Sequence, residues 1–164
     1  MEDLIIRKAT IDDDEVLSHI ALMGKMHWNY PESYFKIWEK ELLITKEYIS
    51  LNTVFVAVVK NEVIGFYSII KIEEDFMADE VFVKKGFWLE HIFILPGFHK
   101  MGIGTKLMKH AISYCKENDI DKLQVFVEPY SVGFYDKIGG EYIADSPSSI
   151  KDRYVPLYEI NIKK

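Results

Sequence analysis

The stretch from Pro96 to Leu107, PGFHKMGIGTKL, combines residue types that bind anions. Gly102 and Gly104 stand one residue apart at the head of a segment with helical apolar spacing. Glycine lets a backbone approach a ligand closely, and a helix start presents unpaired N–H groups at the positive end of its dipole. Three lysines add positive charge here, with no acid between them: Lys100, Lys106 and Lys109. The stretch therefore predicts an anion cradle, most often one for phosphate.

The spacing of the glycines narrows the choice of ligand. No G-x-x-x-x-G-K-[ST] pattern is present, and Leu107 stands where the G-x-G-x-x-G fingerprint needs its third glycine. Neither a nucleoside triphosphate nor a dinucleotide is favoured. The alternative is a tight strand-to-helix turn that binds no ligand.

Glu90 is the next unusual residue, because it lies within the apolar run FWLEHIFIL. A buried carboxylate is costly unless it is paired or protonated, and burial would raise its pKa toward the range of a general base. An ion pair inside the sheet is the alternative. Strand alternation places His91 on the opposite face, where we expect a core histidine. No third ligand is spaced to hold a metal ion with it, so none is predicted.

Tyr135 lies in GFYDKIGG, on an expected short helix where Phe134 points in a different direction. Its hydroxyl could donate a proton to a leaving group, although a plain buried aromatic is the alternative. Lys137 adds positive charge nearby. No serine or cysteine stands in a nucleophile elbow, and Cys115 falls on an apolar helical stripe.

Hydrophobic periodicity predicts an α/β protein with about seven strands. The segment that precedes the glycines lacks alternation and is expected to be a strand buried on both faces. Because a strand, a helix and another strand follow one another there, we expect a parallel pair. The acid-rich segment 73–80 reads as a solvated connection. The expected strands are 4–10, 53–59, 63–72, 86–96, 122–127, 141–145 and 154–162. The expected helices are 11–27, Glu32 to Tyr48, one that follows the glycines and runs to about Asn118, and a short one within 131–140.

The composition limits the class of protein. The 164 residues suffice for one domain with a sizeable core, and 49% hydrophobic residues indicate a globular chain. We expect no signal peptide and no membrane span, and the single cysteine favours the reducing cytoplasm. The net charge of −6 argues against nucleic acid as a partner.

These residues resemble the GNAT superfamily of acetyl-CoA-dependent N-acetyltransferases. The resemblance runs from WLEHIFILPGFHKMGIGTKL through VEPYSVGFYDKIGG to SSIKDRYVPLYEINI, roughly the last half of the chain. It implies a single GNAT-like domain over residues 1–164. That domain would be a three-layer fold with a mixed central sheet, helices on both faces and a splayed central strand pair.

The resemblance also implies roles for individual residues. The backbone of Ile92, Phe93 and Ile94 would pair with the pantetheine arm of coenzyme A. The amides of the turn would hold its pyrophosphate: His99, Lys100, Met101, Gly102, Ile103, Gly104 and Thr105. Tyr130, Phe134 and Lys137 are assigned to the same coenzyme. Glu90 falls where some members place a base, and Tyr135 where many place the acid that protonates the thiolate.

Some positions depart from the family pattern. Lys100 replaces a usual glycine, and His99 stands where many members carry Arg or Gln. Tyr130 and Ser131 replace the usual Asn-Ala, and Arg153 matches an arginine found in a subset of members.

The resulting hypothesis is direct acetyl transfer from acetyl-CoA to a primary amine of a small molecule or peptide, without a metal. An acyl-CoA-binding module without catalysis and a transferase of longer acyl chains are the alternatives. Acceptor contacts are expected from His27, Trp28, Tyr30, Tyr34 and Trp38, with a purely core role as the other interpretation. No membrane partner is expected, and a homodimer is left open.

Overall fold

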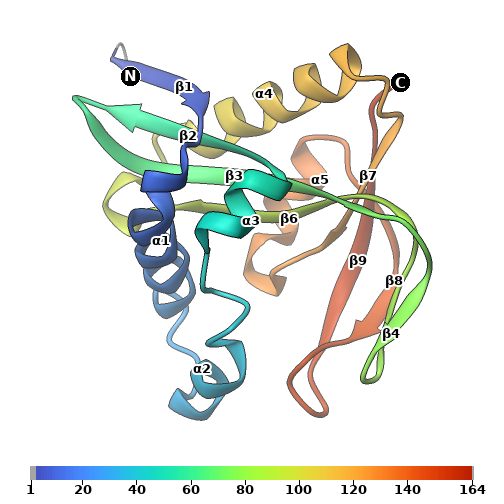
Figure 1. The fold of residues 1–164 in the computed structure, drawn as a ribbon. Coiled ribbons are helices and arrows are strands. Elements are labelled where there is room, and N and C mark those ends of the chain that lie inside the picture. Colours follow the sequence, from blue (N-terminus) through green and yellow to red (C-terminus); the bar gives the residue numbers. More distant parts are fainter. Residues whose placement is uncertain (1–2, 164) are drawn as a thin grey trace. The chain divides into compact units, whose positions relative to one another are not determined.

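A computed structural model describes residues 3–163 of the chain (Figure 1). In chain order the elements of these residues are β1 (Leu4–Lys8), α1 (Asp14–Met26), α2 (Glu32–Trp38), α3 (Lys46–Leu51), β2 (Thr53–Val59), β3 (Glu62–Ile72), β4 (Phe76–Ala78), β5 (Val81–Val83), β6 (Gly86–Ile94), α4 (Ile103–Glu117), β7 (Lys122–Phe126), α5 (Val132–Lys137), β8 (Glu141–Pro147) and β9 (Tyr154–Asn161).

Two compact units divide the chain. The first unit comprises the residues up to Ile69 together with His91–Ala111, and the second comprises Ile70–Glu90 together with the residues from Ile112 onward. β3, β6 and α4 each continue from one unit into the other. The family resemblance led us to expect a single domain, and that expectation stays a prediction.

Seven strands form a mixed sheet in the order β1-β2-β3-β6-β7-β9-β8, so β6 is the middle strand. β6 pairs with β7 in parallel through Trp88 and Gln124, whereas β7 with β9 and β8 with β9 pair antiparallel. β4 and β5 form a separate two-stranded sheet. The predicted fold class is confirmed, and so is the parallel pair on either side of the glycine-containing connection.

The hairpin of β2 and β3 in the first unit is determined by its local sequence. Lys60 and Asn61 both adopt left-handed backbone angles, with φ of 49° and 67°, which match a tight two-residue hairpin turn. The strands then pair antiparallel, with Phe55 opposite Tyr67. The hairpin predicted at this turn is confirmed.

Helices cover both faces of the sheet in the first unit. Phe55 and Tyr67 lie on the face of α4, where the Tyr67 hydroxyl hydrogen-bonds His110 Nδ1 at 2.8 Å. Phe66, the neighbour of Tyr67 in β3, points to the other face and lies near Phe93 of β6. Because α1 packs on Phe93, α1 and α4 lie on opposite faces.

Gly24 permits this packing of α1. A Cβ at Gly24 would lie 2.6 Å from the ring of Phe93, closer than real Cβ contacts allow. The helix therefore approaches the strand at the one position that has no side chain. Leu17 and Ile20 of the same helix are fully buried.

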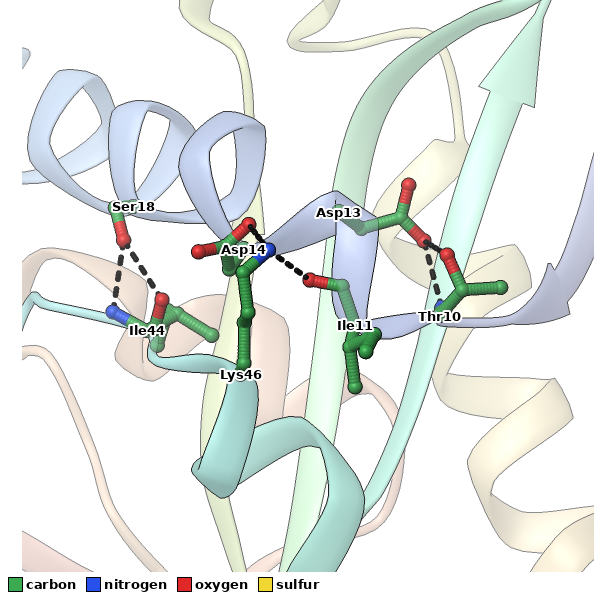
Figure 2. A network of polar contacts seen from close by, with 7 residues as sticks. All are labelled: Thr10, Ile11, Asp13, Asp14, Ser18, Ile44 and Lys46. Atoms are coloured by element: carbon green, nitrogen blue, oxygen red, sulfur yellow. Dashed lines mark hydrogen bonds and ion pairs between the residues drawn. The ribbon is translucent and has the colours of Figure 1, made fainter.

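A polar network fixes the start of α1 to the segment that leads into α3 (Figure 2). The Asp13 carboxylate accepts the Thr10 N–H at 2.8 Å, and Lys46 Nζ donates to the Ile11 carbonyl and to Asp14. Ser18 Oγ accepts the Ile44 N–H at 2.8 Å and donates to the Ile44 carbonyl at 3.1 Å. One hydroxyl thus satisfies both backbone groups of a buried residue.

Two predictions about secondary structure are wrong. The helix expected from Glu32 to Tyr48 is broken into α2 and α3, because Ile44 turns inward and Thr45 caps a new helix by accepting the Tyr48 N–H. The segment 73–80 is exposed as expected, yet it contains β4, which pairs with β5. β6 is also less buried than expected, since only Trp88 and Leu89 are fully buried in it.

Replacing Gly24 by Ala tests the contact with Phe93. We expect lower stability, because an overpacking cost of about 1–3 kcal/mol outweighs a helix-propensity gain of about 1 kcal/mol. Gly133→Ala is the matched control, since Gly133 is also helical and its Cβ would meet nothing within 4 Å. That variant should gain stability. Urea unfolding measures both, and a gain in both variants would contradict the packing argument.

Ser18→Ala should destabilise the protein by about 1–3 kcal/mol, because it leaves two buried backbone groups of Ile44 without partners. Ser50 provides a control, since its hydroxyl donates to the exposed Glu47 carbonyl. Ser50→Ala should change the free energy of unfolding by less than about 0.5 kcal/mol. Equal losses in the free energy of unfolding would show that the hydrogen bonds of Ser18 stabilise the protein no more than the exposed bond of Ser50.

Candidate functional site

The turn between β6 and α4 has the geometry of an anion cradle. Lys100 and Gly102 adopt left-handed backbone angles, with φ of 64° and 76°. α4 begins at Ile103, and the Lys106 N–H donates to the Gly102 carbonyl at 3.1 Å. The helical residues that come before Lys106 have N–H groups with no acceptor within the helix. The turn therefore directs several amides outward.

The surroundings of this turn suit a phosphate group. A Cβ at Gly102 would meet no atom within 4 Å, so that side of the turn is open. Lys100, Thr105 and Lys106 are exposed. The helix dipole favours an anion at the same point. The residues present thus fit a pyrophosphate. The left-handed angle of Lys100 also explains why a glycine would be usual at that position.

His99 and His27 flank the turn. His99 Nε2 lies 3.0 Å from the Ile94 carbonyl, so this nitrogen must carry the proton and donate it. The ring of His99 contacts the edge of His27 at 4.7 Å between centroids, and His27 contacts Trp28 in the same way. Of the residues predicted to bind the acceptor, His27 therefore packs on His99 and Trp28 packs on His27.

The other predicted acceptor residues form a second cluster. Trp38 is buried and meets Tyr30 and Tyr34 edge to face, at 5.2 and 5.5 Å between centroids. Lys25 Nζ lies 4.5 Å from the centre of the Trp38 ring and 5.8 Å from that of Tyr30. Sequence reasoning missed Lys25, because its spacing to Trp38 matches no helical repeat.

His91 and Phe93 of β6 face α1 rather than α4. His91 packs between aromatic rings, with Tyr48 and Phe66 about equally distant at 6.0 and 6.1 Å. Burial, together with the positive charge of Lys25, lowers the pKa of His91 to about 4. The ring is therefore neutral at neutral pH, and by accessible surface the residue is half-buried.

The expected burial of Glu90 is wrong. Glu90 is exposed, although Trp88 and Leu89 immediately before it are buried. Trp88 is held inside because its indole N–H donates to the Lys84 carbonyl at 2.8 Å and its ring packs on Phe126. An apolar run around a carboxylate therefore did not bury it, and a pKa raised by burial is no longer an argument for its role.

Tyr135 lies in α5, which one hydrogen bond fixes to β9 and another fixes to the turn that follows the helix. The Tyr158 hydroxyl donates to Asp136 at 2.7 Å, and the Gly140 N–H donates to the Tyr135 carbonyl at 2.8 Å. Phe134 is half-buried and meets Tyr135 edge to face. Neither contact was predicted from the sequence. The Tyr158–Asp136 bond joins residues far apart in the sequence, and the Gly140–Tyr135 bond depends on the geometry of the turn.

The hydroxyl of Tyr135 differs from those of the other buried tyrosines. Tyr67 bonds His110 and Tyr158 bonds Asp136, but among the described residues the Tyr135 hydroxyl has no hydrogen-bond partner. No buried side-chain oxygen of the described residues lacks a partner, so this hydroxyl reaches the accessible surface while its ring is buried. Burial raises the pKa of Tyr135, which keeps the phenol protonated.

The remaining candidates lie in the second unit. Tyr130 and Lys137 are exposed. Arg153 is mostly buried and lies 3.5 Å from Glu128, so it is not a solvated surface arginine. Cys115 is buried, and burial raises its thiol pKa to about 11, which agrees with the inert core role predicted for it. Among the described residues, no group of three potential metal ligands comes together.

Comparison with known proteins settles the family. A model of the acetyltransferase (GNAT) family matches residues 23–140, which is more than half of the chain. The chain belongs to this family. No curated protein sequence matches the chain significantly.

Solved GNAT structures share the fold over nearly the whole chain. The PaiA N-acetyltransferase of Thermoplasma acidophilum, solved with coenzyme A, is 21% identical with a TM-score of 0.74, covering 96% of this chain and 98% of that one. A GNAT acetyltransferase of Staphylococcus aureus Mu50 is 20% identical with a TM-score of 0.68, covering 97% and 99%. The ribosomal-protein-S18-alanine N-acetyltransferase of Escherichia coli is 13% identical with a TM-score of 0.64, covering 97% and 94%.

The structural matches show the fold, and the family match supports binding of coenzyme A. Within residues 3–163, no helix has the length and apolar character that crossing a membrane requires.

Gly104→Asp should weaken coenzyme A binding at least about tenfold, because like charges about 4 Å apart repel by roughly 1–4 kcal/mol. An acid in the first turn of α4 suits the helix dipole, so the variant should keep its melting temperature. Gly97→Asp is the matched control, since a Cβ there meets nothing within 4 Å. Calorimetry with coenzyme A gives the affinities. Equal affinity for the wild type and Gly104→Asp would remove the pyrophosphate from this turn.

Proposed function

We propose that this GNAT protein transfers an acetyl group from acetyl-CoA to a primary amine by direct attack, with both substrates bound together. The observation that carries the proposal is the turn at the start of α4, where left-handed Lys100 and Gly102 precede the outward amides. It lies within the residues matched by the family model. A reducing compartment such as the cytoplasm belongs to the same proposal, because Cys115 is the only cysteine.

The coenzyme would be held mainly through backbone groups. The amides from Lys100 to Thr105 are proposed to bind the pyrophosphate, with Lys100 and Lys106 adding charge. The His99 amide was expected to join them, but its N–H already donates to the Pro96 carbonyl at 3.2 Å. The backbone of Ile92, Phe93 and Ile94 is proposed to pair with the pantetheine arm. Tyr130, Phe134 and Lys137 are proposed as further contacts to the coenzyme. The His99 ring, bonded to the Ile94 carbonyl, ties the turn to this strand.

Two side chains are proposed to move protons. Bound acetyl-CoA supplies a thioester carbonyl that a neutral amine can attack. Glu90 would take the proton of the amine, directly or through water, and its exposed position leaves it accessible to either. Tyr135 would give a proton to the departing sulfur, and it is suited to this because its hydroxyl is accessible and remains protonated. The N–H of Ile94 is proposed to stabilise the negative charge that develops on the carbonyl oxygen.

The acceptor is proposed to be an amine of a small molecule or of a peptide. Two solved relatives carry the name N-acetyltransferase, and the Escherichia coli relative is named for an alanine of a ribosomal protein. Tyr30 and Tyr34 are half-buried and offer an aromatic surface, whereas Trp38 is buried beneath them and takes the core role. Lys25, which lies 4.5 Å from the centre of the Trp38 ring, shows that a cation is stable in this cluster. His27, which packs on His99, and Trp28, which packs on His27, are proposed to contact the acceptor from the side of the turn. A panel of amines, assayed for thiol release from acetyl-CoA, identifies the acceptor.

Tyr135→Phe removes one hydroxyl without changing the buried ring. Turnover should fall about 10²–10⁴-fold, the usual contribution of a general acid, while affinity for coenzyme A stays the same. Tyr154→Phe is the control, because Tyr154 is 60% exposed. Unchanged turnover of Tyr135→Phe would remove this residue from the reaction.

Glu90→Gln should lower turnover most at low pH, where the acceptor is an ammonium ion and needs a base. At high pH the free amine is abundant, so the activity should partly recover. Glu62→Gln, another exposed glutamate, should leave the pH profile unaltered. Profiles of turnover against pH distinguish Glu90→Gln from Glu62→Gln. A loss that is equal at every pH would assign Glu90 a structural role.

A further inference from the structure

The β4–β5 hairpin carries an apolar pair that no part of its own sheet covers. Met77 lies directly opposite Phe82, so both side chains project from the same face of the hairpin. Met77 is 59% exposed and Phe82 51% exposed. Val81 and Val83 point to the other face and are half-buried, and β5 contacts β8. One face of the hairpin is therefore attached to the protein, whereas the Met77–Phe82 face is open.

Acids lie at both ends of the hairpin. Asp79 and Glu80 form the turn at the tip, and Glu74 precedes β4 at the base. In the part of the chain that the structure describes, these three carboxylates make no ion pair. Glu73 is different because it lies 3.7 Å from Lys71, and Asp75 accepts the Lys85 N–H. The hairpin thus combines an exposed apolar pair with carboxylates that form no ion pair among the described residues.

We propose that the Met77–Phe82 face docks a basic polypeptide segment, in which one apolar side chain packs on Met77 and Phe82 and flanking lysines or arginines meet Glu74 and the Asp79–Glu80 turn. At about 3.3 Å per residue, the acids at the base and the tip are roughly 15 Å apart, which an extended segment spans with four or five residues. Methionine adapts its shape to different apolar partners, and an aromatic ring gives a rigid surface.

Charge distinguishes this partner from other occupants. Two copies of the chain, each with a net charge of −6, would bring uncompensated carboxylates together if the hairpins met. An anionic membrane surface would repel the same groups. A face that served only for solubility would carry the acids without the exposed apolar pair.

The test measures binding of a fluorescein-labelled peptide with blocked ends, Lys-Lys-Gly-Leu-Gly-Lys-Lys, by anisotropy in the absence of acetyl-CoA. We expect wild-type binding that weakens with salt. Phe82→Ser and Glu80→Lys should each raise the dissociation constant at least tenfold. Leu51→Ser, at a position that is 72% exposed, and Glu62→Lys are the matched controls and should bind like the wild type. Circular dichroism verifies that each variant is folded.

Several results would overturn the proposal. No binding by the wild type is one, and binding that neither variant weakens is another. Loss with Phe82→Ser but not with Glu80→Lys would mean an apolar contact without basic chemistry. Concentration-dependent dimerisation that Phe82→Ser abolishes, measured by analytical ultracentrifugation, would assign the face to a second copy instead.

Discussion

The parallel pairing of β6 with β7 is the constraint from which the candidate site follows. Two neighbouring parallel strands cannot be joined by a tight turn, so the chain must return along the sheet before the second strand begins. α4 makes that return, and it must therefore start just beyond the carboxyl end of the middle strand. The unpaired amides of its first turn are a consequence of the topology. What the sequence adds is the pair of left-handed residues, Lys100 and Gly102, and the lysines around them.

A second constraint is that the side chains of β6 lie on two faces of the sheet, which have different neighbours. In the first unit α1 occupies one face of the sheet and α4 the other, and strand alternation assigns each residue to one of them. Phe93 belongs to the α1 face because Gly24 leaves room for its ring. His91 shares that face and is neutral at neutral pH. The strand can therefore offer its backbone to a ligand while its aromatic side chains are held by packing.

Features set by local sequence could be predicted, and features set by distant contacts could not. The Lys60–Asn61 hairpin, α4 with its glycines and the short helix around Tyr135 all depend on neighbouring residues, and each was found. The break between α2 and α3 depends on Ile44 being bound by Ser18, which lies 26 residues earlier. The pairing of β4 with β5 was missed because the acids around it resemble a solvated loop.

Burial of single residues was the least predictable property of the candidate site. Glu90 was expected inside because its neighbours are apolar, but an apolar run does not say which side chain turns outward. Lys25 was overlooked because its spacing to Trp38 in the sequence gives no sign that its ammonium group lies 4.5 Å from the centre of that ring. In both cases the side chain's position depends on elements that lie elsewhere in the sequence.

Ten tyrosines made the catalytic interpretation of Tyr135 weak at the level of sequence. The structure separates them by what their hydroxyls do. Tyr67 and Tyr158 are equally buried, but each uses its hydroxyl to hold another element in place. Tyr135 is held by its ring and its backbone, through Gly140, so its hydroxyl carries no structural hydrogen bond among the described residues. A proton donor needs this combination, because a hydroxyl already committed to the fold would lose that bond each time it reacted.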